Sequence, residues 1–420
     1  MSTGAGRPVF RAALVCLAGC AVAWPQKYYT YIGDIGESAV LVAWGTARGE
    51  GNTIGLKSAS AGRGMVRVDG RDYPAGDKNW VRIESLAPDR EYRYEVSVNG
   101  RNIAEGVFRT HAPDANRLSF FVIGDYGDGG RDQFALAEVM RREMERRRGG
   151  ENPVRFVLTM GDNIYGSGFK PFLFSSGDQD SHWERRFYQP YEPILRSIPF
   201  YASPGNHDGS ESEHRGDLDV YMDNFFFPGG TPSRFYRFRY GKLAEFFSLD
   251  STSNAPQDSK LPIYAAASEQ TKWLEASLRD SQALWKIPYL HHPLFSAGPR
   301  HEPSLERLRH WADLFQRHGV KVVFAGHEHN FQFSQKNEAT KDVLYVVSGS
   351  GGALRGEDIR RNLKAAQIAG WANQHHFLLV EIDGTKLTLT PFGIHPMRVL
   401  DGDGREVAMP LRSEANEHGR

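Results

Sequence analysis

The sequence predicts a layered α/β domain, in which a β-sandwich is flanked by helices, preceded by a small all-β sandwich domain. Three observations lead to this prediction. The chain has 420 residues, which at roughly 100–200 residues per domain corresponds to about two or three domains. Apolar and polar residues alternate with a period of two over residues 28–111. From residue 117 onward, apolar strands alternate with helices, which is typical of a layered α/β fold.

The composition narrows the function classes. Hydrophobic residues make up 40% of the chain, and 51 basic residues balance 51 acidic ones. Global disorder requires lower hydrophobicity and a charge excess, and a general nucleic-acid binder has a basic excess, so neither class fits. No apolar run approaches the roughly 18 residues of a membrane span. Both cysteines, Cys16 and Cys20, lie near the start, which excludes a disulfide framework and a zinc-finger site.

Residues 1–24 have the pattern of a secretory signal segment. Two arginines precede an apolar stretch over residues 12–23, in the order expected of an export signal. Two processing routes stay open. The small residues ending at Ala23 fit a signal peptidase site, whereas the segment ending at Cys20 resembles a bacterial lipobox, in which this cysteine would carry a lipid anchor. Either route predicts a protein that is secreted or belongs to the periplasm or cell envelope.

Residues 25–112 are expected to form the small all-β domain. The dipeptide Asn99-Gly100 is a hairpin turn signal between two alternating segments. The arrangement of Trp44, Leu86-Ala87-Pro88 and Tyr92 resembles a fibronectin type III domain. No residue pattern for chemistry occurs here, so we expect a structural role. The predicted strands cover residues 40–44, 65–68, 92–98 and 106–110.

Residues 117–397 are expected to form the larger domain, with residues 398–420 as a C-terminal tail. In sheets of this kind the chemistry lies on loops at the carboxyl ends of the strands. The predicted strands cover residues 118–123, 154–160, 200–202, 235–240, 243–249, 287–290, 320–325, 343–347, 377–382 and 387–391. The predicted helices cover residues 132–148, a segment opened by Ser268, and residues 304–318.

Five loops, each directly after an apolar strand, carry residue types that bind metals. A single Gly-Asp after a strand is usually a turn or a helix cap, but five such loops in one chain indicate a common site. Carboxylate, imidazole and amide ligands together suit iron, manganese or zinc. Two adjacent metals need a bridging carboxylate and about six further protein ligands. The loops are Gly124-Asp125-Tyr126-Gly127, Gly161-Asp162-Asn163-Ile164-Tyr165, Gly205-Asn206-His207-Asp208, His291-His292 and Gly326-His327-Glu328-His329.

This set of motifs resembles the calcineurin-like metallophosphoesterases, and specifically the purple acid phosphatases. The segments GDYG, GDNIY, GNHD, LHHP and GHEH are similar to the family's pattern of GDxG, GDxxY, GNH[DE], VxxH and GHxH. The tyrosine of the second motif distinguishes the purple enzymes, since they use it to bind ferric iron and other metallophosphoesterases lack it. The resemblance implies a metal-dependent acid phosphatase, and it extends to a β-sandwich before the catalytic domain.

The resemblance also implies a dinuclear centre that hydrolyses phosphate monoesters by attack of a metal-bound hydroxide. A trivalent ion acidifies its bound water further than zinc does, so the expected pH optimum is acidic to neutral, without a phosphoenzyme. The implied ligands of Fe(III) are Asp125, Tyr165 and His329, those of a divalent ion (Fe, Zn or Mn) are Asn206, His291 and His327, and the bridging ligand is Asp162.

The resemblance implies catalytic roles for three further residues. His207 would be the general acid that protonates the leaving group, and Asp208 would orient it. His301 lies near the position of a second substrate-contacting histidine.

The fourth motif departs from the family pattern. Pro288 stands where the family has valine, and His292 follows His291, so the ligand assignment could shift by one residue. Adjacent strand residues face opposite ways, and only one of the two can point at the metals. Pro293 matches the family's H-x-P and favours His291.

Two other functions are weighed against the phosphatase. A phosphodiesterase or nucleotide pyrophosphatase of the same superfamily is the alternative, and Tyr165 favours the monoesterase over it. A binding protein with a degenerate site is disfavoured by the intact ligand positions. The expected partners are small phosphorylated substrates and not nucleic acid, with a membrane contacted only through a lipid at Cys20.

Overall fold

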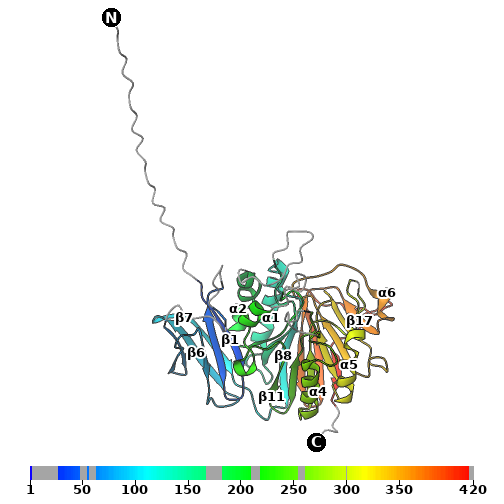
Figure 1. The fold of residues 1–420 in the computed structure, drawn as a ribbon, viewed down its shortest axis with the longest axis horizontal. Helices are drawn as coiled ribbons and strands as arrows, with labels where there is room; N and C mark the ends of the chain where they lie inside the picture. The colour runs from blue at the N-terminus through cyan, green and yellow to red at the C-terminus, as the bar shows by residue number, and fades with distance from the viewer. Residues whose placement is uncertain are drawn as a thin grey trace.

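The computed structural model describes residue 1 and residues 27–47, 54–55, 63–166, 182–209, 218–253, 261–298 and 300–415. Both cysteines and nearly all of the segment expected as an export signal lie outside these residues. An all-β sandwich at the N-terminal end stands beside a larger sandwich with helices on its outer faces (Figure 1), which confirms the predicted fold class. Within the described ranges, no helix is both long enough and apolar enough to cross a membrane.

The N-terminal sandwich consists of two antiparallel sheets. Asn99 and Gly100, the predicted hairpin turn, have φ angles of 51° and 76°, as a type I′ turn requires. One sheet has the order β1 (Tyr29–Ile35), β2 (Val40–Gly45) and β5 (Trp80–Ile83). The other has the order β4 (Arg71–Pro74), β3 (Gly64–Val68), β6 (Glu91–Val98) and β7 (Arg101–Arg109).

Trp44 is fully buried in the core between these two sheets. Its ring packs directly on Gly64, where an added Cβ would lie 2.2 Å from Trp44 Cζ2. A larger residue at this strand position would collide with the indole, so the close approach requires glycine. Beside this core, the Ala87 N–H donates to Tyr92 Oη at 2.7 Å. This bond ties the segment before β6 to the sandwich.

Two mixed sheets form the larger sandwich. Strands β8, β9 and β10 are parallel to one another, as are β12, β13, β14 and β16. The six-stranded sheet has the order β10 (Phe200–Ser203), β9 (Val154–Met160), β8 (Arg117–Ile123), β18 (His376–Asp383), β19 (Lys386–Gly393) and β20 (Leu411–Glu414). The seven-stranded sheet has the order β11 (Tyr236–Tyr240), β12 (Ala244–Ser248), β13 (Trp285–Tyr289), β14 (Val322–Ala325), β16 (Leu344–Ser348), β15 (Phe331–Ser334) and β17 (Ile368–Ala372).

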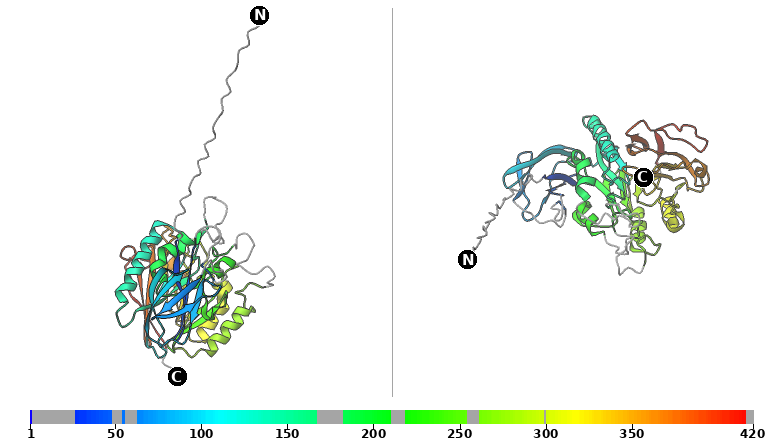
Figure 2. Two further views of the ribbon diagram at one scale, coloured as in Figure 1. Left: turned by 90° about the vertical axis from the view of Figure 1, so that its left-hand side faces the viewer. Right: turned by 90° about the horizontal axis from the view of Figure 1, so that it is seen from above.

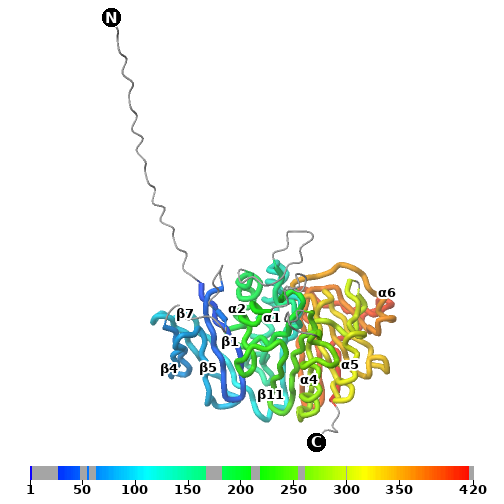
Figure 3. The backbone as a smooth tube through the Cα atoms, viewed as in Figure 1, coloured from blue at the N-terminus to red at the C-terminus, as the bar shows by residue number. Residues whose placement is uncertain are grey.

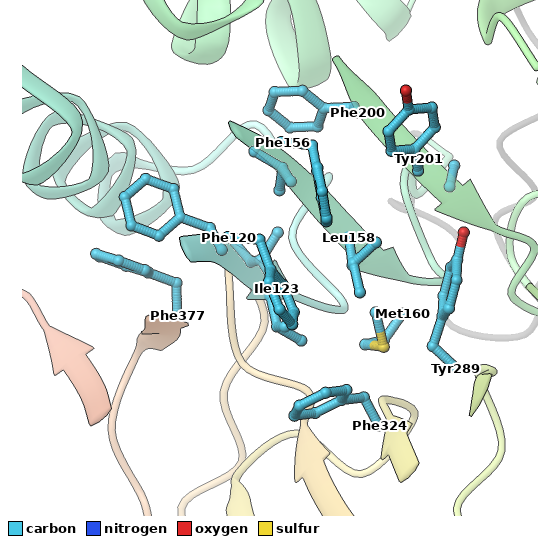
Figure 4. Packing of buried hydrophobic residues seen from close by; sticks show 14 of the residues in the cluster. Phe120, Ile123, Phe156, Leu158, Met160, Phe200, Tyr201, Tyr289, Phe324 and Phe377 are labelled. Carbon is cyan, nitrogen blue, oxygen red and sulfur yellow. The ribbon is translucent and has the colours of Figure 1, made fainter. Parts of the chain in front are cut away.

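Aromatic side chains hold the two large sheets together. Phe120 and Phe156 come from the six-stranded sheet, and Phe324 approaches from the other sheet (Figure 4). Phe120 meets Phe246 edge to face with ring centroids 5.2 Å apart, and Phe156 meets the same ring at 5.1 Å. Edge-to-face contacts of this kind are directional. They fix the spacing of the sheets, and with it the positions of the loops at the strand ends.

Helices cover the outer faces of the larger sandwich (Figure 2). On the six-stranded side lie α1 (Arg131–Arg147) and α2 (Gln189–Leu195), which continues from a π-helical turn at Glu184–Tyr188. On the seven-stranded side lie α4 (Glu269–Asp280) and α5 (Leu305–Arg317). Ser268 caps α4, as its sequence position predicts, by accepting the Thr271 N–H at 3.1 Å. The short helices α3 (Asp219–Asn224) and α6 (Arg360–Leu363) and the 3-10 turn Pro228–Gly230 lie in the connections.

The C-terminal segment differs from the tail that the sequence suggested for residues 398–420. Residues 411–414 form β20, which pairs antiparallel with β19 at the edge of the six-stranded sheet. Leu411-Arg412-Ser413-Glu414 contains a single apolar residue, so no hydrophobic alternation marks the strand. Its conformation is set by the open hydrogen-bonding edge of β19. Residues 416–420 lie outside the described part of the chain.

Strand β1 joins the two sandwiches, and all seven of its residues are buried. It lies beside α2 (Figure 3), with one face on the N-terminal core and the other on the larger sandwich. Tyr31 packs edge-on against Phe187 and Phe226, with ring centroids 6.0 and 5.4 Å away. Tyr201 Oη donates to Asp34 Oδ1 at 2.9 Å across the same junction. The two sandwiches therefore pack on opposite faces of β1, and this strand couples them.

Removing the Tyr31 ring tests this junction. We expect Tyr31→Ala to lower the free energy of unfolding by about 3–5 kcal/mol, as for other buried aromatic truncations. Chemical denaturation followed by tryptophan fluorescence measures it. Tyr73→Ala, on the N-terminal edge strand β4 where the ring is half-buried, is the control and should cost less than half as much. A wild-type chain whose N-terminal sandwich unfolds in a separate transition would contradict this coupling of the two sandwiches through β1.

Candidate metal centre

The five predicted loops meet at one edge of the larger sandwich. Three of them follow the parallel strands β8, β9 and β10 of the six-stranded sheet, and two follow the parallel strands β13 and β14 of the facing sheet. The carboxyl ends of parallel strands lie at the same edge of a sheet, where α/β proteins bind their ligands. The gathering of these loops therefore follows from the topology.

Three of the predicted side chains converge in a first cluster. Tyr165 Oη lies 3.2 Å from Asp125 Oδ1 and 3.2 Å from His329 Nε2. His329 Nε2 in turn lies 3.3 Å from Asp125 Oδ1. Asp162 borders the same cluster, because donor atoms of Asp125, Asp162 and His329 all lie within 4.8 Å of one another. Four donors from three separate loops thus surround one point.

A second cluster centres on His291. Its Nε2 lies 2.9 Å from Asn206 Oδ1, 3.1 Å from His327 Nδ1 and 3.4 Å from Asp162 Oδ1. Asp162 therefore borders both clusters: it lies near Asp125 and His329 in the first and near His291 in the second. A carboxylate in that position is what two adjacent cations need as a shared ligand.

His291 and His292 occupy different environments. His291 Nδ1 lies 2.8 Å from the Met160 carbonyl oxygen, so this nitrogen donates its hydrogen and Nε2 keeps a lone pair directed at the second cluster. His292 Nδ1 instead lies 3.0 Å from Ser251 Oγ. One nitrogen of His292 is also within 4.8 Å of donor atoms of His291 and His327. The contacts of Nε2 with three other donors favour His291.

The loops hold each other through the same carboxylates. The His327 N–H donates to Asp125 Oδ2 at 2.8 Å, and the His207 N–H donates to Asp162 Oδ1 at 2.9 Å. Asp125, Asp162 and His327 all have left-handed backbone conformations, with φ of 54°, 47° and 70°. Such conformations cost about 1–3 kcal/mol each and persist where the surroundings impose them. The donor positions are therefore built into the backbone.

Two glycine segments let the loops approach each other. A Cβ at Gly205 would lie 2.1 Å from the Asp162 backbone nitrogen, so this contact excludes every other residue. The sequence Ser348-Gly349-Ser350-Gly351-Gly352 forms a close-packed turn behind the first cluster. In it, the Gly351 N–H donates to the Gly124 carbonyl and the Gly352 N–H to the Asp125 carbonyl, both at 3.0 Å.

Burial governs the titration of the donors. Burial raises the pKa of the Asp125 carboxyl from 3.8 to about 8, with His291 opposing and the Asp162 charge adding to the rise. Burial, together with the charges of Asp125 and Asp162, raises the pKa of the Tyr165 phenol well above its ordinary value. Burial lowers the pKa of His327 well below 6.5, so this imidazole is neutral and able to bind a cation. Near neutral pH, a strong positive charge bound beside them would favour the anionic forms of the Asp125 carboxyl and the Tyr165 phenol.

The remaining predicted residues lie around the two clusters. His207 is half-buried, and its ring centroid lies 4.8 Å from that of Tyr165. The His301 ring lies 3.9 Å from the His327 ring, also centroid to centroid. Asp208 is buried, and its two carboxylate oxygens accept N–H groups of Asn163, Ile164 and Gly205. This aspartate thus ties the second loop to the third.

Sequence reasoning missed two supporting groups. Asn163 donates through Nδ2 to the Ser203 carbonyl at 2.9 Å and to Asp208 Oδ2 at 2.8 Å, which fastens the GDNIY loop beneath the site. The signal that could have identified Asn163 was its position inside the GDNIY motif. The second group is the fully buried Glu328, whose Oε1 lies 3.8 Å from Arg355 Nη1. Arg355 comes from a loop that no motif marks.

Comparisons with known proteins agree with this geometry. The family model described as calcineurin-like phosphoesterase matches residues 118–331. Tartrate-resistant acid phosphatase type 5 of Mus musculus is 27% identical over 255 residues, which cover 56% of this chain and 72% of that protein. Purple acid phosphatase 4 of Arabidopsis thaliana is 28% identical over 261 residues, covering 57% and 70%.

Solved structures show the shared fold. The purple acid phosphatase PPD1 from yellow lupin seeds has a TM-score of 0.68 at 17% identity, covering 94% of this chain and 76% of that one. The matched family segment spans about half of the chain and contains every donor of both clusters. The relatives of this segment are metal-dependent phosphoester hydrolases. On these grounds the chain belongs to the calcineurin-like phosphoesterase family and is a homologue of the purple acid phosphatases.

Proposed function

We propose that this chain is an exported acid phosphatase that hydrolyses phosphate monoesters at a dinuclear metal centre. The observation that carries the proposal is the sharing of Asp162 between two clusters of donors. Its Oδ1 is 3.4 Å from His291 Nε2, and it also lies within 4.8 Å of the donor atoms of Asp125 and His329. A single-metal site has no need of such an arrangement.

The two clusters differ in chemistry, and each suits a different ion. A phenol and carboxyl groups, once deprotonated, are hard anionic donors that favour Fe(III), whereas an amide oxygen and two imidazoles suit a divalent ion such as Fe, Zn or Mn. When bound, the two cations would neutralise the phosphate oxygens and acidify a water. The proposed Fe(III) ligands are Asp125, Tyr165 and His329, those of the divalent ion are Asn206, His291 and His327, and Asp162 is shared.

His207 is the proposed proton donor to the leaving group. Its half-buried ring can reach a bound substrate, and its backbone N–H is fixed on Asp162 at 2.9 Å. Asp208 acts as a positioning residue, because its carboxylate holds the backbone of the second and third loops. His301, stacked near His327, is placed to contact the substrate.

We also propose where the protein is located and what it binds. Export rests on the signal-like pattern of residues 1–24, with soluble secretion and a lipid at Cys20 as the two routes. The N-terminal sandwich is proposed to be fibronectin type III-like and structural, in line with its packing against the larger sandwich through β1. The partners are small phosphorylated substrates, and the balanced charge does not favour nucleic acid.

A visible spectrum and a metal analysis test the ferric assignment. The purified chain should hold about two metal ions and show a phenolate-to-iron charge-transfer band. Tyr165→Phe should remove the band. Tyr126→Phe changes a phenol that bonds Asn163 and is not part of either donor cluster, so it should keep the band. Two metal ions with no band in the wild type would contradict Fe(III) at Tyr165 and leave the phosphoesterase chemistry standing.

The role of His207 is tested through the leaving group. His207→Ala should lower kcat about 10²–10⁴-fold on an alkyl phosphate, whose leaving alkoxide needs a proton. The loss should be much smaller on p-nitrophenyl phosphate, because nitrophenolate leaves without protonation. His395→Ala, at an exposed histidine remote in sequence from the five loops, should leave both rates unchanged. Equal losses on the two substrates would argue against proton donation by His207.

The raised pKa of Asp125 gives a pH signature to metal-free protein. A group with a raised folded-state pKa stabilises fully below its unfolded pKa, and this contribution is lost as the pH rises through the folded value. Between pH 4 and about 8, Asp125 should therefore make the metal-free chain progressively less stable. Asp125→Asn is neutral at every pH and lacks this component. The difference between the two Tm profiles should grow with pH, and a constant difference would contradict the shift.

A further inference from the structure

A hollow of about 500 Å³ lies beside the second donor cluster. His327, His292 and His301 are among the residues that line it. Its volume falls in the usual range of about 300–1,000 Å³ for small-molecule sites. Because His327 belongs both to the hollow and to the donor cluster, a substrate whose phosphoryl group is held at the cluster extends its remaining atoms into this space.

The start of α5 forms another part of the lining, through Ser304, Glu306 and Arg307. This helix has 13 residues, and Ser304, its N-cap, makes no side-chain hydrogen bond to the first turn. The N–H groups of an uncapped first turn carry partial positive charge and favour a nearby anion.

His292 supplies an independent donor. It is 6% exposed and lines the hollow. Its backbone N–H donates to Ser251 Oγ at 3.0 Å, and Nδ1 lies 3.0 Å from the same oxygen. When the serine hydroxyl donates to Nδ1, the ring hydrogen lies on Nε2. Across the residues described by the structure, Nε2 has no hydrogen-bond partner.

Arg307 supplies a positive charge at the lining of the hollow. Its guanidinium lies 4.9 Å from the centroid of the Tyr264 ring, which holds it by a cation–π contact. In the described ranges it forms no ion pair with a carboxylate. Arg300, the other arginine of the hollow, is already neutralised by Glu357 Oε1, at 2.8 and 3.0 Å. The planar donor fork of Arg307 is therefore free to bind an oxyanion.

The hollow also contains two acidic groups, Glu302 and Glu306, and both are exposed. Water screens exposed charges strongly. Arg307 is half-buried against Tyr264, so its field in the hollow is screened less. The net preference is for a negative group near Arg307 and His292.

We propose that this hollow binds a second anionic group of the substrate, a phosphate or a carboxylate, through Arg307, His292 and the first turn of α5. The inference rests on the proposed function, since the reacting phosphate must be held at the donor clusters. It defines the substrate class as small phosphate monoesters that carry another negative charge. Arg307 is then the specificity-determining residue.

Matched substrates test the proposal with the metal-loaded full chain. 3-Phosphoglycerate and glycerol 3-phosphate differ only in a carboxylate in place of a hydroxymethyl group, and fructose 1,6-bisphosphate differs from fructose 6-phosphate by a second phosphate. We expect kcat/KM to favour the more anionic member of at least one pair by about 10- to 100-fold, the usual worth of a charge-assisted bidentate contact. A preference in the first pair only identifies a carboxylate, and one in the second pair only identifies a phosphate.

Arg307→Gln should bring the favoured ratio close to one, and Arg307→Lys should give an intermediate ratio because the charge stays and the fork is lost. Arg309→Gln, at an exposed neighbour on α5 that does not line the hollow, should keep the wild-type ratio. Since both members of a pair are measured on one preparation, partial misfolding cannot imitate a change in ratio. Ratios near one in the wild type, or ratios that Arg307→Gln leaves unchanged, would overturn this inference while the phosphatase stands. Failure to hydrolyse any of the four substrates would instead contradict the proposed function.

Discussion

The structure of the site depends on holding two carboxyl groups, Asp125 and Asp162, side by side and away from water. They are 0% and 1% exposed, and burying an uncompensated charge costs several kcal/mol. The chain offsets part of this cost with N–H groups, from His327 to Asp125 and from His207 to Asp162. It offsets another part by favouring a proton on Asp125. Bound cations would offset more of this cost, so cation binding and the stability of the five loops are linked.

This arrangement needs a rigid frame, because a cation site tolerates little displacement of its donors. The frame has two levels. The aromatic contacts between the sheets, such as Phe120 with Phe246, set the distance between the strands that carry the loops. Within the site, Asp208 and Asn163 join the loops after β9 and β10 by hydrogen bonds between buried groups. The left-handed conformations of the donor residues are sustained by these ties, and any one of them would be unfavourable in a free loop.

The sequence alone predicts those strands and donor residues whose signals lie within a few neighbouring positions. Long apolar runs mark β8 and β9, and the polar motifs after them mark the donors, because each signal lies within a few residues. Elements defined by a partner are not predictable in this way. β20 exists because β19 has a free edge, and β1 is buried on both faces because two sandwiches meet on it. For the same reason, no motif points to Arg355, whose relation to Glu328 is created by the tertiary fold.

The residues that hold the metals and the residue proposed to select the substrate come from different parts of the fold. The donors come from motif loops on parallel strands, and altering them would disturb the carboxyl pair on which the site depends. Arg307 lies on α5, which packs in a separate apolar cluster with α4 on the outer side of the seven-stranded sheet. His292 points to Ser251 while its neighbour His291 faces the donors. Arg307 can therefore change without displacing a single donor, which makes the hollow beside His327, rather than the clusters themselves, the place where a preference among phosphate esters is encoded.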